Sequence, residues 1–148
     1  MELVRDFNAP TIYLISDNEV PSLDQLPWSD EQCDAFVAIL ESAHLTHELA
    51  RDIASGLVGV RTDWIETMGN GAEFLHDLID AAGVAIGRQA EVGDGDPMTA
   101  WHEDLTDSDS MIAYIRSGGQ GGTDNQLIIV IGSRPYAGAF ADTLRKRP

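Results

Sequence analysis

Five consecutive apolar residues at positions 127–131, Leu-Ile-Ile-Val-Ile, constrain the fold of this chain more than any other feature. Successive side chains of a strand point to opposite faces, so a strand that is apolar throughout is covered on both faces. Residues 11–16 form a second β-branched run, near the N-terminus, and also predict a strand. Residues 111–116 are apolar in the same continuous way. We therefore expect a buried sheet built from these three segments.

The two C-terminal runs, residues 111–116 and 126–132, flank a glycine-rich segment at 117–125. This pattern predicts a hairpin with a long loop. Pro135 can occupy the first turn of a final helix, whose expected inward side chains are Tyr136, Phe140 and Leu144. Basic residues at its end complement the helix dipole.

The central part of the chain has the spacing of helices. Ser29 and Gln32 form a capping box, which predicts a helix with a buried stripe of Cys33, Phe36, Val37 and Leu40. A second helix is expected from Thr46, with inward Leu49, Ile53 and Leu57. A short third segment carries Trp64, Ile65 and Met68. Asn70 and Glu73 cap a fourth helix that ends at Gly83, with inward Phe74, Leu75, Leu78 and Ile79.

These elements predict an α+β fold in a single domain, residues 1–148. A four-helix unit at about 29–83 and the C-terminal helix pack on the small sheet. An acidic loop with a short helix occupies about 87–110, where Asp96 and Pro97 are expected to start a helix through Trp101 and Leu105. The hairpin and terminal helix occupy 111–148. The alternative is a helical domain with an appended hairpin.

The charge of the chain is strongly asymmetric. Twenty-five Asp and Glu oppose nine Lys and Arg, for a formal charge of −16. Residues 17–109 hold twenty-one of the acids but three bases, and residues 91–109 hold seven acids and no Lys or Arg. Such a surface repels nucleic acid and anionic membranes and attracts basic partners. We expect no direct nucleic-acid binding and no membrane association.

Cysteine use and the N-terminus bear on the compartment. The single cysteine, Cys33, excludes an intramolecular disulfide framework. The first residues lack a basic segment followed by a long apolar one, and no apolar run approaches the ~20 residues of a membrane span. We therefore expect a cytoplasmic protein without a cofactor. The oligomeric state is left open.

Histidines provide the pattern closest to a catalytic one. His47 lies on one expected helix and the His76-Asp77 pair on a later one. This pattern resembles HD-domain metal-dependent phosphohydrolases over about a third of the chain. The resemblance implies that His47, His76 and Asp77 would be ligands of a divalent metal that activates water, with Asp104 or Asp107 as the last. The competing interpretation places His76 and Asp77 on the solvated face of an amphipathic helix.

The leading hypothesis is a non-enzymatic interaction protein that binds a basic, nucleic-acid-binding site on a protein partner. The candidate classes are an inhibitor or immunity protein of a nuclease-type toxin, an anti-defence protein and a nucleic-acid mimic. Closely spaced carboxylates would imitate phosphates and raise the association rate. The expected contact residues are Trp101, Glu103, Asp104, Asp107, Asp109, Asp94 and Asp96. Acids on outer helix faces would add to the field: Asp30, Glu31, Asp34, Glu41, Asp77 and Asp80.

Two alternatives come from other classes. One is a small metal-dependent, phosphohydrolase-like enzyme centred on His47, His76 and Asp77. The other is an adaptor or regulatory domain from a high-GC or salt-adapted host, whose acidity serves only solubility. The single Lys beside eight Arg fits the second alternative.

Overall fold

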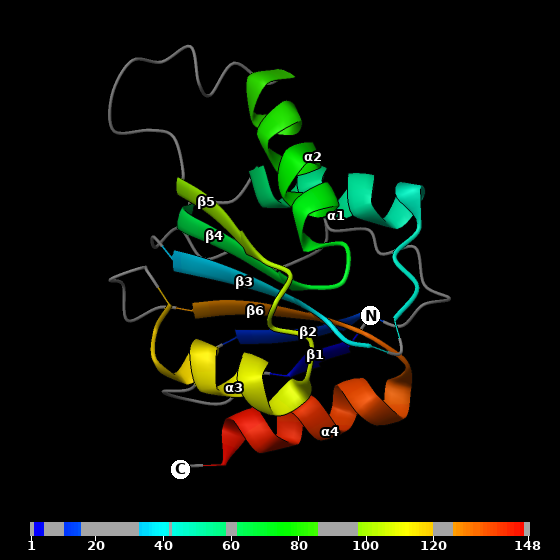
Figure 1. Cartoon of the computed structure of the whole chain (residues 1–148), viewed down its shortest axis with the longest axis vertical. Helices are drawn as coiled ribbons and strands as arrows, with labels where there is room; N and C mark the ends of the chain where they lie inside the picture. The colour runs from blue at the N-terminus through cyan, green and yellow to red at the C-terminus, as the bar shows by residue number, and fades with distance from the viewer. Residues whose placement is uncertain are drawn as a thin grey trace.

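The computed structural model describes residues 2–4, 11–15, 33–41, 43–58, 62–85, 98–119 and 126–146. Its strands are β1 (Glu2–Val4), β2 (Thr11–Ile15), β3 (Cys33–Ile39), β4 (Thr62–Gly69), β5 (Met98–His102) and β6 (Gln126–Ile131). Its helices are α1 (His47–Val58), α2 (Ala72–Ala85), α3 (Ser108–Arg116) and α4 (Arg134–Arg145). Figure 1 shows the helices on both sides of one twisted sheet.

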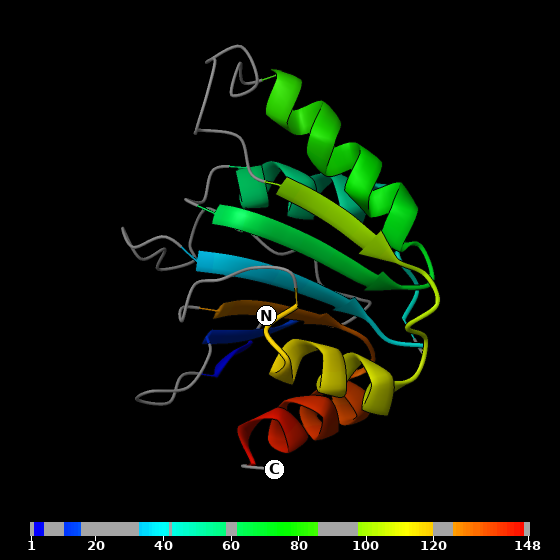
Figure 2. The same cartoon turned by 60° about the vertical axis from the view of Figure 1, so that its left-hand side comes forward.

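The described strands form one sheet in the order β1-β2-β6-β3-β4-β5. β1 is antiparallel to β2, and all other neighbours are parallel. The helices that follow β3 and β4, α1 and α2, lie on one face, and α3 and α4 lie on the other (Figure 2). This is a mixed α/β architecture with a mainly parallel, doubly covered sheet. The expected mixture of helices and strands is confirmed, but their arrangement is α/β rather than the expected α+β.

Strand alternation divides the core into two layers. Odd-numbered residues of β3, such as Val37, join α1 and α2 in one cluster, and even-numbered ones, such as Phe36, join α3 and α4 in the other. The run at 127–131 divides in the same way, with Ile129 in the first cluster and Ile128 in the second. Its continuous apolarity was predicted to mean cover on both faces, and this is confirmed.

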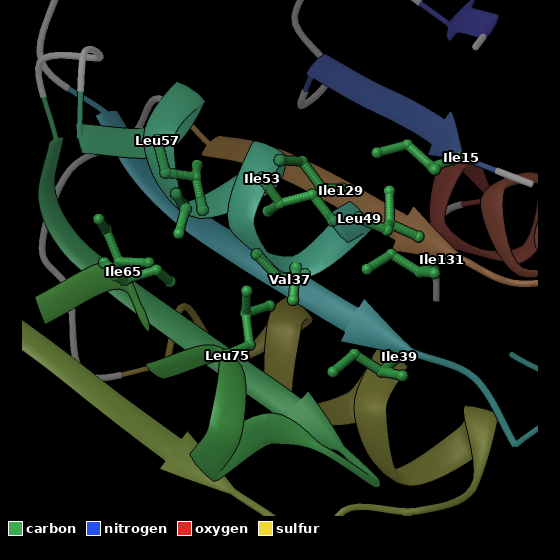
Figure 3. Packing of buried hydrophobic residues seen from close by; sticks show 14 of the residues in the cluster. Ile15, Val37, Ile39, Leu49, Ile53, Leu57, Ile65, Leu75, Ile129 and Ile131 are labelled. Atoms are coloured by element: carbon green, nitrogen blue, oxygen red, sulfur yellow. The ribbon is translucent and has the colours of Figure 1, made fainter. Parts of the chain in front are cut away.

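Helix α1 shows how the first layer is closed. Thr46 Oγ1 accepts a hydrogen bond from the backbone N–H of Leu49 at 3.1 Å, which caps the helix at the expected residue. Leu49, Ile53 and Leu57 then point into the sheet, as the spacing predicted (Figure 3). The N-terminal strand and α4 are confirmed as well. However, Tyr136 of α4 is 64% exposed and does not point inward.

Three segments expected in helices are strands. Phe36, Val37 and Leu40 are buried as expected, but the first two lie in strand β3. Trp64, Ile65 and Met68 belong to β4, and Trp101 belongs to β5. The capping box and Asp96-Pro97 lie outside the described residues. The predicted four-helix unit is therefore wrong, because two of its segments form central strands of the sheet.

The expected hairpin is also wrong, because residues 111–116 belong to helix α3. Met111, Ile112 and Ile115 are buried, and the intervening Ala113 is exposed, which is the spacing of a helix with one buried face. α3 connects β5 to β6 across two intervening strands, so β6 pairs with β2 and β3. Helix α2 has the expected place but continues past Gly83 to Ala85, and its Phe74 is exposed.

Within the described part of the chain, no helix combines the length and the apolarity needed to span a membrane.

Candidate functional site

At the point where a doubly wound sheet normally binds ligands, the described residues include an apolar side chain. In such sheets the site lies at the carboxyl ends of neighbouring strands whose helices go to opposite faces, here β3 and β6. Leu40 lies directly against Gly132 there: a Cβ on Gly132 would be 2.9 Å from Leu40 Cδ1. Gly132 therefore has to be small, and its role at this point is packing.

Polar and aromatic side chains gather instead around β5, the outermost described strand. Its side chains alternate between the two faces. Thr99 and Trp101 lie on the face covered by α2, where both contact His76. His102 lies on the opposite face, where it contacts Glu66 and Tyr114. β5 thus carries one polar cluster on each side of the sheet.

Trp101 is the exposed aromatic residue of the first cluster. It is 45% exposed, and its ring centroid lies 4.6 Å from that of His76, with the planes tilted by 51°. His76 itself is buried. One side of the indole is therefore held by a fixed neighbour while the remainder is open to a partner, which is how tryptophan is used at binding hot spots.

The hydrogen bonds of His76 keep this neighbour in place. Its Nδ1 lies 3.1 Å from Asp77 Oδ1, and its Nε2 lies 2.9 Å from Thr99 Oγ1. The Thr99 hydroxyl donates its proton to Asp80 Oδ1 at 2.9 Å, so it can only accept from His76. Both ring nitrogens thus face oxygen atoms of neighbouring side chains, which fixes the orientation of the ring.

The acidic residues that follow β5 are exposed. Glu103 and Asp104 lie in the turn after the strand, and Asp107 and Asp109 lie at the start of α3. We call Trp101, Glu103, Asp104 and Asp109 the β5 patch. Asp107 is kept apart because it has a structural role, described next. Asp94 and Asp96, also expected at the contact, lie outside the described residues.

Asp107 is the N-cap of α3. Its side chain accepts hydrogen bonds from the backbone N–H and the hydroxyl of Ser110, both at 2.8 Å. These two bonds, the backbone one first, lower the pKa of the Asp107 carboxyl below its usual value. The carboxylate form is the one that caps the helix.

We expect Asp107→Ala to lower the thermal stability of the chain at pH 7. Because the folded-state pKa is lowered, the stabilisation by the charge is present above the ordinary Asp pKa of ~3.9 and is lost as pH falls through the folded value. The difference in melting temperature between the variant and the wild type should therefore become smaller as the pH falls below the pKa of an ordinary Asp carboxyl. Asp107→Asn keeps a capping oxygen without the charge and is the matched control. An equal loss at every pH would contradict this assignment.

The second cluster surrounds Glu66, which is fully buried in β4. Its Oε1 accepts a hydrogen bond from the Tyr114 hydroxyl at 2.5 Å and lies 3.1 Å from His102 Nε2. The backbone of Gly119 approaches so closely that a Cβ there would be 2.1 Å from Glu66 Oε2, and its φ is +58°. The buried Glu66 side chain thus links β4 to β5 and to α3.

This cluster was not among the predicted site residues. A local signal existed, because Glu66 follows the apolar Ile65 directly and such acids are rarely buried without partners. Its partners lie 36 and 48 residues away in the sequence, so no local spacing identifies them.

The structure does not assemble the predicted metal ligands. His76 and Asp77 are hydrogen-bonded, but His47 packs edge-on against Phe74, with ring centroids 4.9 Å apart. Among the described residues, no three His, Cys, Asp or Glu side chains are grouped so that they could hold a metal ion. The resemblance to HD-domain phosphohydrolases therefore gains no support from the geometry.

The acidic residues expected on outer helix faces differ in how exposed they are. Asp77 is exposed and Asp80 is partly exposed, both on α2, and Glu41 is exposed after β3. Asp34 is buried in β3, because the segment is a strand and not a helix, and its expected exposure is wrong. Asp30 and Glu31 lie outside the described residues.

A function can be argued from the exposed Trp101, its contact with His76 and the exposed carboxylates that follow it in the chain. The doubly wound architecture alone does not decide among functions, because it serves many unrelated ones. Comparison with known proteins finds no family model that matches the chain and no curated protein that matches it.

Proposed function

We propose that this chain is an acidic protein-interaction module that binds a basic site on a partner protein through the β5 patch. The observation that carries the proposal is the exposed Trp101 fixed against His76 at the start of a run of exposed carboxylates. A rigid aromatic side chain supplies contact area at low entropic cost, and the surrounding charge directs the encounter.

The charge of the whole chain supports a cationic partner. A net charge of −16 on 148 residues repels nucleic acid and raises the association rate with a cationic cleft. A basic patch or stripe is the electrostatic footprint of a nucleic-acid-binding site. Inhibition of such a cleft by an immunity or anti-defence protein, with carboxylates in place of phosphates, is the form of the function that we favour.

The position of the basic residues fits the same geometry. Of the Lys and Arg residues that the structure describes, four lie at the end of α3 or on and after α4 (Arg116, Arg134, Arg145 and Lys146) and one, Arg51, lies on α1. α4 packs against β2 and β6, toward the opposite edge of the sheet from β5 (Figure 1). The electric field of the described surface is therefore polarised, which would orient a basic partner toward β5 before contact.

The β5 patch gives the test of this function. The wild-type chain should retain a basic partner at low salt and release it as salt rises past roughly 0.3–0.5 M, where screening becomes short-ranged. Trp101→Ala should weaken the affinity at least tenfold, because truncating a central aromatic anchor costs about 1.4 kcal/mol or more. The measurement is the dissociation constant for the purified partner by calorimetry, with nucleic acid as competitor.

Matched variants separate the patch from general acidity. Tyr136→Ala removes an exposed aromatic residue from α4 and should leave binding unchanged. Glu103→Gln, Asp104→Asn and Asp109→Asn together neutralise the patch without removing the Asp107 cap. If the partner binds this triple variant as tightly as it binds the wild type, the proposed function is wrong. It is also wrong if the wild-type chain does not compete with nucleic acid for the partner.

A further inference from the structure

We infer that β5 receives an extended, basic segment of the partner as an additional strand of the sheet. This inference rests on the proposed function and specifies how the partner binds. β5 is the outermost strand at its edge, and among the described strands it pairs only with β4. The backbone hydrogen-bonding groups on its outer side have no strand partner in the described part of the chain.

β5 lacks the features that usually prevent pairing at a sheet edge. Proteins protect such edges with charged side chains, proline, bulges or very short strands. The five residues of β5, Met-Thr-Ala-Trp-His, include no Lys, Arg, Asp, Glu or Pro, and their pairing with β4 is continuous. The opposite edge of the sheet is different, because β1 has three residues and begins with Glu2. Strand addition is therefore favoured at β5.

The side chains beside β5 define what the added strand would carry. Alternate side chains of that strand would lie on the α2 face, next to Trp101 and near the Asp77 and Asp80 carboxylates. These carboxylates are open to a partner, with 69% and 43% of their side-chain surfaces exposed. Asp77 is hydrogen-bonded to His76, and Asp80 to Thr99 with a further contact of 3.6 Å from its Oδ2 to His76 Nε2, so each carboxylate keeps acceptor sites for a partner.

Arginine at every second position fits this face best. Its planar guanidinium can bond a carboxylate with two parallel N–H groups and can also stack on an indole. The intervening side chains would lie on the other face beside His102, whose ring packs against Tyr114 of α3, so small uncharged residues fit there. The inferred ligand is an extended protein segment in which Arg alternates with residues such as Thr.

The experiment uses the complete chain and a capped peptide of about eight residues in which Arg alternates with Thr. Its first comparison is a block isomer, with all Arg preceding all Thr, which keeps the composition and the charge. Its second comparison is a pair of N-methylated peptides, one methylated at the Arg positions and one at the Thr positions. In a strand, alternate N–H groups point to the same side, so only one of the two sets can bond β5.

We expect the alternating peptide to bind at least tenfold more tightly than the block isomer. One N-methylated peptide should lose at least tenfold in affinity and the other should bind nearly as the parent does. Binding should also slow amide hydrogen exchange at residues 99–102. Asp77→Asn with Asp80→Asn should weaken binding of the parent peptide, while Asp142→Asn, an exposed acid on α4, should not.

The possible failures are distinguishable. If the basic peptides bind but the two N-methylated peptides behave alike, strand addition is wrong and the proposed function stands. If no basic peptide binds, and no basic protein partner is retained either, both proposals are wrong. Equal binding of the alternating and block peptides, with unchanged exchange at 99–102, also rules out strand addition.

Discussion

Gly69→Ala should destabilise the fold more than any other glycine-to-alanine change in the described chain. Gly69 ends β4 with a φ of +101°, a conformation that alanine adopts only with strain. A Cβ there would also lie 2.1 Å from the carbonyl oxygen of Ile39, a backbone atom of the neighbouring strand that cannot rotate away. Strain at φ and the steric clash each cost about 1–3 kcal/mol, so a loss of about 2–6 kcal/mol is expected.

The measurement is the free energy of unfolding from denaturant titration at pH 7. The slope of this free energy against denaturant concentration is compared between the variants, since a changed slope would indicate a different unfolding transition. Gly138→Ala is the matched control, because Gly138 lies within α4 and a Cβ there meets no atom within 4 Å. That variant should be more stable than the wild type by about 0.5–1 kcal/mol. Equal stability of the two variants would contradict the close approach of β3 and β4 at Gly69.

The elements that could be predicted from the sequence are those with a local signal. Thr46 and Pro135 mark the beginnings of α1 and α4, and cap chemistry acts within a single turn. The 127–131 run indicated β6 because its short length and β-branched composition favour a strand over a helix. The partner strands and the parallel order of β6 depend on contacts between distant segments. These were predicted incorrectly.

β3 shows why short apolar runs are ambiguous. Residues 35–40 are all apolar, so they contain the helical spacing of Phe36, Val37 and Leu40 together with every other spacing. Burial on both faces of the sheet decided the outcome, since each residue of β3 from Asp34 onward is buried. Helix α3 is the reverse case, because its residues 111–116 were expected to form a strand. Asp107 and Ser110 form a cap before an equally apolar segment, and that local signal was missed.

The candidate site was predicted in part for the same reason. The sequence identified Trp101 as an aromatic residue in an acidic segment, and the structure exposes it together with Glu103, Asp104 and Asp109, which follow it in the chain. These residues are neighbours in the chain. The support of Trp101 by His76 joins α2 to β5, and the Glu66 cluster joins β4, β5 and α3. Only the order of the strands brings those residues together.

Tyr114→Phe should cost about 1.5–3 kcal/mol of stability, the value for a hydrogen bond to a buried charged group. The Tyr114 hydroxyl donates to Glu66 Oε1 at 2.5 Å, and burial of that carboxylate is tolerable only while donors surround it. Tyr136→Phe, at an exposed ring, should change stability by less than about 0.5 kcal/mol. Combining Tyr114→Phe with Glu66→Gln tests the pair, because the glutamine has no charge to satisfy and the double variant should lose less than the sum of the two single losses. Denaturant titration of the four proteins measures this coupling. Strict additivity, or a negligible loss in Tyr114→Phe, would show that Glu66 does not depend on Tyr114 and that the cluster does not hold α3 against the sheet.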